Sequence, residues 1–480
     1  LFYRNYNFLS ISLKEKDIMQ QNQTEELGSC SVGKLLFKLA VPAIAAQIIN
    51  LLYNLVDRMY IGHIANVGKL ALTGVGVCLP LIMLISAFAA LVSMGAAPRA
   101  SIFLGKGEHE NAEKTLGNSF SLLIILSLVI TVIFFFFSED LLFGASENTI
   151  EYAVDYMMIY SLGNIFVQLT LGLNAFISAQ GFATVSMMTV LIGAICNIIL
   201  DPIFIFGFNM GVSGAALATI ISQALSMLWI LKFLTGKKTT LKIKRKNLSL
   251  SKNIVLPSIA LGLAPFIMQA TESLIAVCFN SSLLKYGGDI AVGAMTILTS
   301  VMQFSMLPLT GLTQGGQPII SYNFGAKNAD RVKKTFKLLL ISCLTYSTIL
   351  WAAAMISPQL FVLIFNNDPE LVDFASHALR IYMAVSCIFG IQIACQQTFI
   401  ALGNAKASLF LALLRKVILL IPLIYIIPIF MADKTTAVFM SEPVADILAV
   451  TTTSILFIVQ FKKSMKEIST PLDNTTPINA

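Results

Sequence analysis

The sequence contains very little charge. Of its 480 residues only 12% are Asp, Glu, Lys or Arg, whereas 56% are hydrophobic. Soluble domains carry about 25% charged residues, so a chain with half that share cannot cover a surface that faces water. The composition therefore excludes a soluble enzyme, a disordered chain and a nucleic-acid-binding protein. It is typical of a protein that crosses a membrane repeatedly, because each crossing helix needs about 20 apolar residues.

The residue types that carry metal, redox or nucleotide chemistry are also scarce. The three His and seven Cys are scattered and form no CxxC pair, so we expect neither a metal centre nor a disulfide framework. The sequence has no P-loop, GxSxG or HExxH motif, and these are the usual signatures of nucleotide, acyl and zinc chemistry. We therefore expect no enzyme activity, no ATP hydrolysis, no cofactor and no nucleic-acid partner.

Long apolar runs recur along almost the whole chain and predict an all-α integral membrane protein. Twelve spans are expected, six in each half, at 35–57, 70–97, 115–137, 152–180, 184–206, 212–234, 253–281, 290–318, 337–357, 374–402, 406–430 and 437–461. Several spans exceed the minimum length, so we expect them to tilt or bend.

The basic residues predict the orientation. With the N-terminus inside, the inner tails and loops hold 25 of the 32 Lys and Arg residues. Such residues concentrate in cytosolic loops, which predicts a multi-pass protein of the plasma or inner membrane with both termini cytosolic. We interpret the densest loop as a topology signal and linker, with a lipid-headgroup or regulatory role as the alternative. This loop contains Lys232, Lys237, Lys238, Lys242, Lys244, Arg245, Lys246 and Lys252.

These observations predict five parts of the chain. They are a cytosolic tail at 1–34, a first lobe at 35–234, a basic linker at 235–252, a second lobe at 253–461 and a cytosolic tail at 462–480. The first methionine is Met19, so we expect residues 1–18 to be an upstream extension.

The two halves repeat each other at an offset near 220 residues. The segment GAAPRASIFLGKGEHENAEKT at 95–115 matches GGQPIISYNFGAKNADRVKKT at 315–335, which aligns Pro98 with Pro318 and Gly105 with Gly325. Because each half has six spans, the repeats have the same topology. Two facing six-helix bundles are the pattern of alternating-access transporters.

Polar residues at membrane depth are costly and usually face a cavity or a partner. The first span places Gln47, Asn50, Asn54 and Asp57 at spacings of three and four residues, which puts them on one helix face. For Asp57 the alternatives are an interfacial carboxylate paired with Arg58 or a helix cap.

The fifth span contains a second acidic position. Asn197 and Asp201 lie four residues apart on one face, directly before Pro202, and Thr219 in the sixth span could add an oxygen. Together with Asp57 these groups are hard oxygen donors, which suit H⁺ or Na⁺ rather than soft metals. The alternative for Asp201 is a structural hydrogen bond at the proline kink.

The second half has a different set of polar residues. Glu272 in the seventh span is interpreted either as a substrate or coupling carboxylate or as a structural partner of Arg415. Candidate cavity residues around it are Gln269, Gln392, Gln396 and Arg415, beside Lys416, together with Asn50 and Asn54 of the first half. Glu442 and Asp446 open the twelfth span, where the helix dipole could stabilise both.

These residues resemble the multidrug and toxic compound extrusion (MATE) family, and are similar to its MepA-like bacterial subgroup. The resemblance rests on LAVPAIAAQIINLLYNLVDRMYIGHI, on ISAQGFATVSMMTVLIGAICNIILDPIFIFGFNMGVSGAALAT, on the repeated proline–glycine segments and on SEPVADILA. It covers about residues 33–463. It implies twelve helices in two six-helix lobes arranged as a V, with a cavity that opens to one side at a time.

The resemblance also implies export of cationic or amphipathic organic compounds in exchange for H⁺ or Na⁺. The family's first-lobe cation site maps onto Asp57, Asn197, Asp201 and Thr219, which makes a bound Na⁺ there one expectation. A second-lobe site of one branch maps onto Glu272, but the tenth span lacks the matching Asp. We expect a monomer that contacts membrane lipid.

Two other functions fit the sequence less well. A lipid-linked saccharide flippase of the same superfamily should have a cationic cavity. Arg415 and Lys416 would favour such a cavity, whereas the acidic residues at membrane depth, Asp57, Asp201 and Glu272, disfavour it. An integral-membrane enzyme or receptor is disfavoured by the repeat and by the lack of a catalytic motif.

Overall fold

The computed structural model describes residues 23–142 and 146–469, and every regular element in those ranges is helical. The expected extension at 1–18 and the last residues of the predicted tail lie outside these ranges. The first-half elements are α2 (Val32–Gly62), α3 (Gly68–Gly105), α4 (His109–Leu141), α5 (Ile150–Leu162), α6 (Asn164–Ala179), α7 (Ala183–Pro202), η1 (Ile203–Gly207) and α8 (Gly211–Thr235).

A short 3₁₀ turn, η2 (Arg245–Asn247), leads into the second half. The elements that follow are α9 (Lys252–Gly325), α10 (Ala329–Ile356), α11 (Pro358–Leu363), α12 (Pro369–Tyr382), α13 (Ser386–Ala401), α14 (Ala405–Leu413), η3 (Leu414–Leu420), α15 (Ile421–Phe430), α16 (Lys434–Phe439) and α17 (Ser441–Ser469).

The described helices account for the twelve predicted spans. Nine are long and apolar enough to cross a membrane, and two further spans are bent pairs, α5 with α6 at 59° and α12 with α13 at 51°. One of the nine, α9, has 74 residues and is broken at Gly288, where φ is 64° and ψ is −161°. Glycine adopts positive φ without steric cost, so the two halves of α9 form separate spans. The predicted all-α membrane fold is confirmed.

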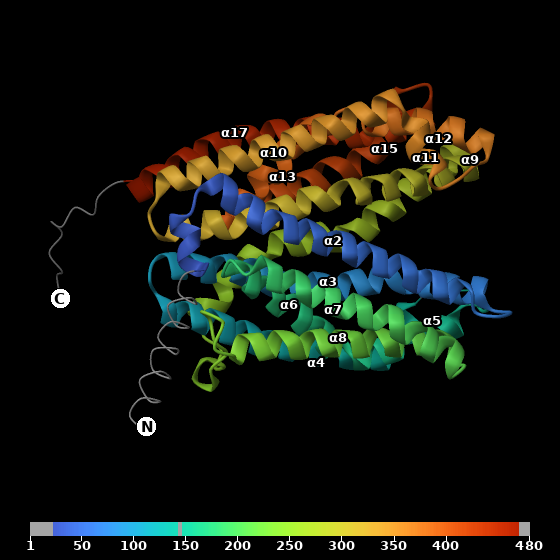
Figure 1. Cartoon of the computed structure of the whole chain (residues 1–480). Coiled ribbons are helices and arrows are strands. Elements are labelled where there is room, and N and C mark those ends of the chain that lie inside the picture. Colours follow the sequence, from blue (N-terminus) through green and yellow to red (C-terminus); the bar gives the residue numbers. More distant parts are fainter. Residues whose placement is uncertain (1–22, 143–145, 470–480) are drawn as a thin grey trace, which may run out of the picture.

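The helices form two lobes that run side by side along their length (Figure 1). The first lobe contains α2–α8 and packs around apolar residues such as Ile85, Leu123 and Met157. The second contains α9–α17 and packs around residues such as Phe279 and Phe439. Each lobe therefore has its own core, which agrees with the repeat read from the sequence.

Both described ends of the chain lie at the same end of the bundle (Figure 1). The 235–252 linker and the turns at 106–108 and 326–328 lie there too, and contacts of residues 24–30 with Gln180, Thr240 and Arg331 connect these segments. We call this end the basic end, because it carries most of the Lys and Arg residues.

The lobes contact each other closely in the half of the molecule nearest the basic end. A β-carbon at Gly105 would lie 1.9 Å from the Tyr322 carbonyl oxygen, and one at Gly325 would lie 2.0 Å from that of Ile102. Only glycine allows helices to approach so closely. Since Gly105 and Gly325 are equivalent positions of the repeat, the repeated segments pack against each other.

Nearer the middle of the bundle the contacts between the lobes are fewer. Gln47 Nε2 donates to Gln314 Oε1 at 3.2 Å, and the rings of Phe88 and Phe266 lie 5.1 Å apart. Among residues 23–142 and 146–469, no side-chain hydrogen bond joins the lobes beyond the Gln47–Gln314 pair toward the opposite end. The ribbons separate in that direction (Figure 1), so the lobes form the predicted V.

Candidate functional site

The first-lobe site forms where α7 changes its winding. Pro202 ends α7 and the π-helix η1 follows at once. Proline cannot donate to the preceding turn, and π-helical turns are frequent at functional sites. The irregular winding lies directly beside Asp201, which is fully buried.

Three of the four predicted coupling residues are joined by hydrogen bonds. The Asn197 side chain, 1% exposed, donates from Nδ2 to Asp201 Oδ1 at 3.1 Å and to Thr219 Oγ1 at 3.4 Å. One amide thus connects α7 with α8. The alternative for Asp201, a structural hydrogen bond at the proline kink, accounts for Oδ1 only, because Oδ2 has no hydrogen-bond partner.

Asp57 of α2 is the fourth residue, and it is 8% exposed. It is close enough to interact electrostatically with Asp201 and with Tyr156 of α5. Its neighbour Arg58 is exposed, and no ion pair between the two is formed in the part of the chain that the structure describes. Asp57 is therefore a buried carboxylate that interacts electrostatically with Asp201 and with Arg58 but forms a direct ion pair with neither a Lys nor an Arg among the described residues.

The site contains three buried oxygens without a hydrogen-bond partner. They are Asp57 Oδ1, Asn197 Oδ1 and Asp201 Oδ2. A buried acceptor that lacks a donor is costly, and a carboxylate at membrane depth is more so. A proton or a hard cation would satisfy these oxygens. Within residues 23–142 and 146–469 no cluster of three His, Cys, Asp or Glu residues forms a metal centre.

The other polar residues of α2 are not part of this site. Asn50 and Asn54 are exposed, and Asn54 Nδ2 donates to the Asn50 carbonyl at 2.6 Å. Gln47 contacts the second lobe instead. The polar stripe of α2 therefore divides into a contact between lobes, two exposed amides and one buried carboxylate.

The second lobe contains a buried charge cluster that the sequence only partly indicated. Arg415 Nη2 donates to Glu442 Oε1 at 2.7 Å, and Arg415 Nε donates to Asp446 Oδ1 at 2.8 Å. The guanidinium also lies 4.6 Å from the centre of the Phe389 ring. Arg415 is thus held by both carboxylates of α17, an ion-pair role that the helix-dipole interpretation of Glu442 and Asp446 missed.

Glu272 pairs with Lys416 rather than with Arg415. Lys416 Nζ lies 2.6 Å from Glu272 Oε1, and the side chains are 10% and 52% exposed. Both basic residues lie in the π-helix η3, where they are buried side by side. Charges at membrane depth need partners, so the sequence indicates that these basic residues pair with carboxylates but not which carboxylate each one takes.

A small cavity with room for about one water molecule adjoins the cluster. Its polar lining comes from Gln392, Gln396, Arg415 and Lys416. Gln392 Oε1 accepts from Thr453 at 2.5 Å, and Gln396 Nε2 contacts the Met268 sulfur at 3.0 Å. The structure therefore brings Gln392, Gln396 and Arg415 together, while Gln269 is half-buried on α9.

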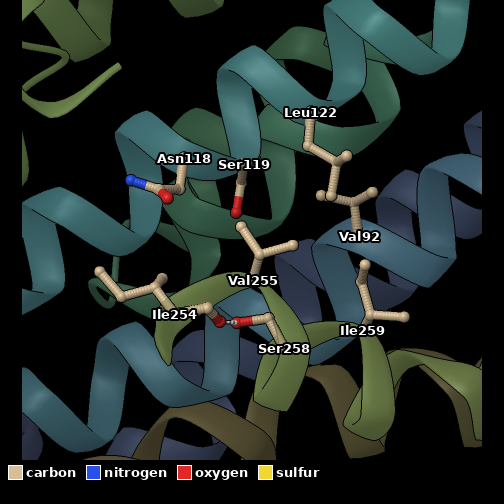
Figure 2. A pocket seen from close by; sticks show the side chains of 8 residues that line it. All are labelled: Val92, Asn118, Ser119, Leu122, Ile254, Val255, Ser258 and Ile259. Atoms are coloured by element: carbon tan, nitrogen blue, oxygen red, sulfur yellow. Dashed lines mark hydrogen bonds between the residues drawn. The ribbon is translucent and has the colours of Figure 1, made fainter. Parts of the chain in front are cut away.

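A second cavity, also with room for about one water molecule, lies between the lobes near the basic end. Figure 2 shows that its lining is mainly apolar, with Asn118 and Ser119 on α4 and Ser258 on α9. The Asn118 amide already bonds the linker, donating to the Asn247 carbonyl at 3.1 Å and accepting from Ser251 N at 2.6 Å. This cavity has no charged lining residue and marks where the linker docks.

The chain is similar in sequence to proteins of one known family. A family model described as MatE matches residues 42–203 and again 265–426. The multidrug export protein MepA of Staphylococcus haemolyticus is 26% identical over 411 residues, which covers 85% of this chain and 90% of that protein. MepA of Staphylococcus aureus is also 26% identical, over 412 residues.

Solved structures share the fold. The MATE multidrug transporter DinF-BH, solved with a bound ligand, has a TM-score of 0.85 and 32% identity and covers 92% of this chain and 99% of that one. A MATE structure in a bent conformation has a TM-score of 0.87 and 22% identity, covering 93% of this chain and 99% of that one.

Proposed function

Because the chain belongs to the MatE family, we propose that it is a secondary active transporter that exports cationic and amphipathic organic compounds in exchange for H⁺ or Na⁺. The similarity to MepA export proteins and to a MATE multidrug transporter supports the class of substrate. The basic end is then cytosolic, the lobes open to the outside in this structure, and the protein acts as a monomer in the cell membrane.

One observation carries the ion coupling. The buried oxygens of Asp57, Asn197 and Asp201 have no hydrogen-bond donor, and the donor set is of the hard type that binds H⁺ or Na⁺. Neutralising two nearby carboxylates removes their repulsion and their desolvation cost. An ion that binds one arrangement of α2 and α7 more tightly shifts the lobes toward it.

The substrate is proposed to bind between the lobes. Glu272 is half-exposed and attracts organic cations, since charge interactions are strong in a low-dielectric setting. The exposed amides of Asn50 and Asn54, Gln269 and the polar side chains around the second-lobe cavity complete the candidate surface.

The flippase alternative receives no support from the basic residues. A pyrophosphate group would need a free cation, but Arg415 and Lys416 are both engaged by carboxylates. The pairs of Arg415 are buried on both sides and are therefore costly to break. The surplus charge of the cluster, with three carboxylates for two cations, is negative and suits a cationic substrate.

The proposal is tested by efflux of ethidium from proteoliposomes under imposed gradients. A pH gradient and a Na⁺ gradient are applied separately, each with the membrane potential clamped. We expect one of the two to drive ethidium against its concentration gradient. Ethidium transport that neither gradient accelerates would contradict the exchange mechanism. The absence of any ethidium transport would contradict the assigned function.

A further inference from the structure

The second lobe contains a half-exposed carboxylate, Glu272, that already pairs with a cation from the protein itself. Glu272 Oε1 accepts from Lys416 Nζ at 2.6 Å. We propose that Lys416 is a built-in competitor that the transported organic cation must displace from Glu272, so that Lys416 sets which cations the second lobe accepts. This inference rests on the proposed function and deepens it.

The geometry makes the two partners unequal. Glu272 is 52% exposed whereas Lys416 is 10% exposed, so a ligand reaches the carboxylate before the ammonium. A carboxylate offers two oxygens, and Lys416 bonds only Oε1. A ligand cation therefore approaches Glu272 from the open side and weakens its bond to Lys416.

A displaced Lys416 has other acceptors within the lobe. Gln392 and Gln396 line the second-lobe cavity together with Lys416, and each side-chain carbonyl oxygen has two lone pairs. Arg415 does not compete for Glu272, because Glu442 and Asp446 hold it. The lysine thus exchanges one oxygen partner for another while the ligand neutralises Glu272.

Substitution of Lys416 distinguishes this role from a structural one, because loss of a competitor strengthens ligand binding whereas loss of a structural contact does not. With Lys416→Met the competitor is lost and the carboxylate stays, so the Kd for tetraphenylphosphonium should fall about tenfold, a coupling of ordinary size. Lys416→Arg should leave the Kd within about twofold. Binding is measured on the purified full chain by equilibrium dialysis, with Lys416→Gln as a second neutral variant.

The double variant completes the cycle. Adding Glu272→Gln to Lys416→Met should cancel the gain in affinity, since the gain depends on the freed carboxylate. Unchanged or weaker binding in Lys416→Met would overturn the proposal, as would a gain that survives Glu272→Gln. Ethidium efflux by the wild type is measured in parallel. Binding that responds as expected without efflux would contradict the proposed function alone.

A separate observation concerns residues 23–31, which we call the strap. At its start Thr24 Oγ1 donates to the Gln180 carbonyl at 3.2 Å and lies 2.8 Å from Thr240 Oγ1. Gln180 and Thr240 belong to the first lobe and its linker. Gln180 is itself fixed, because its Oε1 accepts from the backbone of Thr240 and Leu241, both at distances below 3 Å.

The other end of the strap bonds the second lobe. Asn323 Nδ2 donates to the Leu27 carbonyl at 2.7 Å, and Arg331 Nη2 donates to the Leu27 and Cys30 carbonyls at 3.0 and 2.8 Å. Leu27 is fully buried, and Ile319 of the second lobe and Ala183 of the first belong to the same apolar cluster. The strap is therefore bonded to both lobes at the basic end.

We infer that the strap is a conformational device that holds the basic end closed. Opening this end separates Gln180 and Thr240 from Asn323 and Arg331, so the strap must release one lobe. Because it connects the lobes in series, breaking either attachment is sufficient. Its bonds exist only when this end is closed, and they therefore shift the equilibrium toward the state in which the opposite end is open.

The test measures the distance between the lobes at the basic end. Spin labels at the exposed positions Glu108→Cys and Asp330→Cys report it by double electron–electron resonance, with Cys30, Cys196 and Cys387 replaced by Ser. Thr24→Val or Arg331→Gln should each raise the long-distance population about fivefold, as expected for the loss of one or two hydrogen bonds. Ser29→Ala is the control, because Ser29 bonds only Glu25 of the strap.

The double variant separates a strap from two unrelated contacts. If the two attachments act in series, the double variant Thr24→Val with Arg331→Gln should raise the long-distance population no more than the stronger single variant does. If they are independent contacts, the free-energy effects of the two single variants should add. Additive effects would overturn the inference. So would distance distributions of the single variants that match those of the wild type and of Ser29→Ala.

Discussion

At the scale of residues, the two lobes differ in whether their buried charged groups have partners. In the first lobe Asp57 and Asp201 are buried with unpaired oxygens. In the second lobe Arg415 neutralises Glu442 and Asp446. Unpaired carboxylates at membrane depth persist only where function requires them, whereas a saturated pair is compatible with a structural role. The first lobe is therefore the candidate coupling site.

Arg415 and Lys416 should differ strongly in their effect on stability. Arg415→Met leaves Glu442 and Asp446, which are 6% and 5% exposed, as uncompensated buried charges, at a cost of about 3–5 kcal/mol. Lys416→Met leaves Glu272, a carboxylate that is 52% exposed and not buried. We expect a large fall in Tm for the first variant and a small change for the second. Thermal unfolding of the purified proteins checks this, and equal changes in Tm would contradict it.

The candidate residues could be predicted from the sequence to different extents. Asn197 and Asp201 stand in an otherwise apolar run, so their spacing was informative, and the structure joins them. The pairing of Glu272 with Lys416 was not predictable, because neighbouring basic residues point in different directions on a regular helix. Their joint burial depends on the π-helical winding of η3, which sequence patterns do not reveal.

At the scale of elements, hydropathy predicted the spans but not their breaks. The sequence suggested a connection near residues 282–289, whereas α9 continues to Gly325 with a single non-helical residue at Gly288. Apolar length determines that a segment crosses the membrane. Bends such as that between α5 and α6 depend on packing against neighbouring helices, which no single segment encodes.

Gly288 should not tolerate a side chain, although a neighbouring glycine of α9 should. At a φ of 64° and a ψ of −161° an alanine is strained by about 1–3 kcal/mol, so Gly288→Ala should lower the Tm. Gly293 is helical and a β-carbon there would lie 3.6 Å from the nearest atom, of Leu371. Gly293→Ala should therefore raise the stability by about 0.5–1 kcal/mol. A Tm for Gly288→Ala at or above that of Gly293→Ala would contradict this account.

At the scale of the molecule, the repeat determines how the lobes meet. The family prediction is confirmed by the match of both halves, and the two-lobe fold by the similarity to solved MATE structures. The sequence aligned Gly105 with Gly325 but could not show that these positions face each other. That contact depends on the packing of α3 against α9, which brings residues over 200 positions apart together.

Closing the basic end should depend on these glycines. A β-carbon at Gly105 or Gly325 would overlap a carbonyl oxygen of the other lobe. Overpacking of this kind costs about 1–3 kcal/mol, so Gly105→Ala and Gly325→Ala should keep the lobes apart and reduce efflux about tenfold. Gly76→Ala is the control, because no atom lies within 4 Å of a β-carbon there. Normal efflux by both variants, at normal membrane levels, would refute the close contact.

The central claim is that the buried carboxylates of the first lobe couple ion binding to export. The most direct measurement compares wild type and Asp201→Asn for ethidium efflux from proteoliposomes under the driving ion gradient. The substitution keeps the shape and the partner Asn197 but removes the charge. We expect gradient-driven efflux to fall to the level of empty liposomes while ethidium binding persists. Gradient-driven efflux at the wild-type rate in Asp201→Asn would contradict the account.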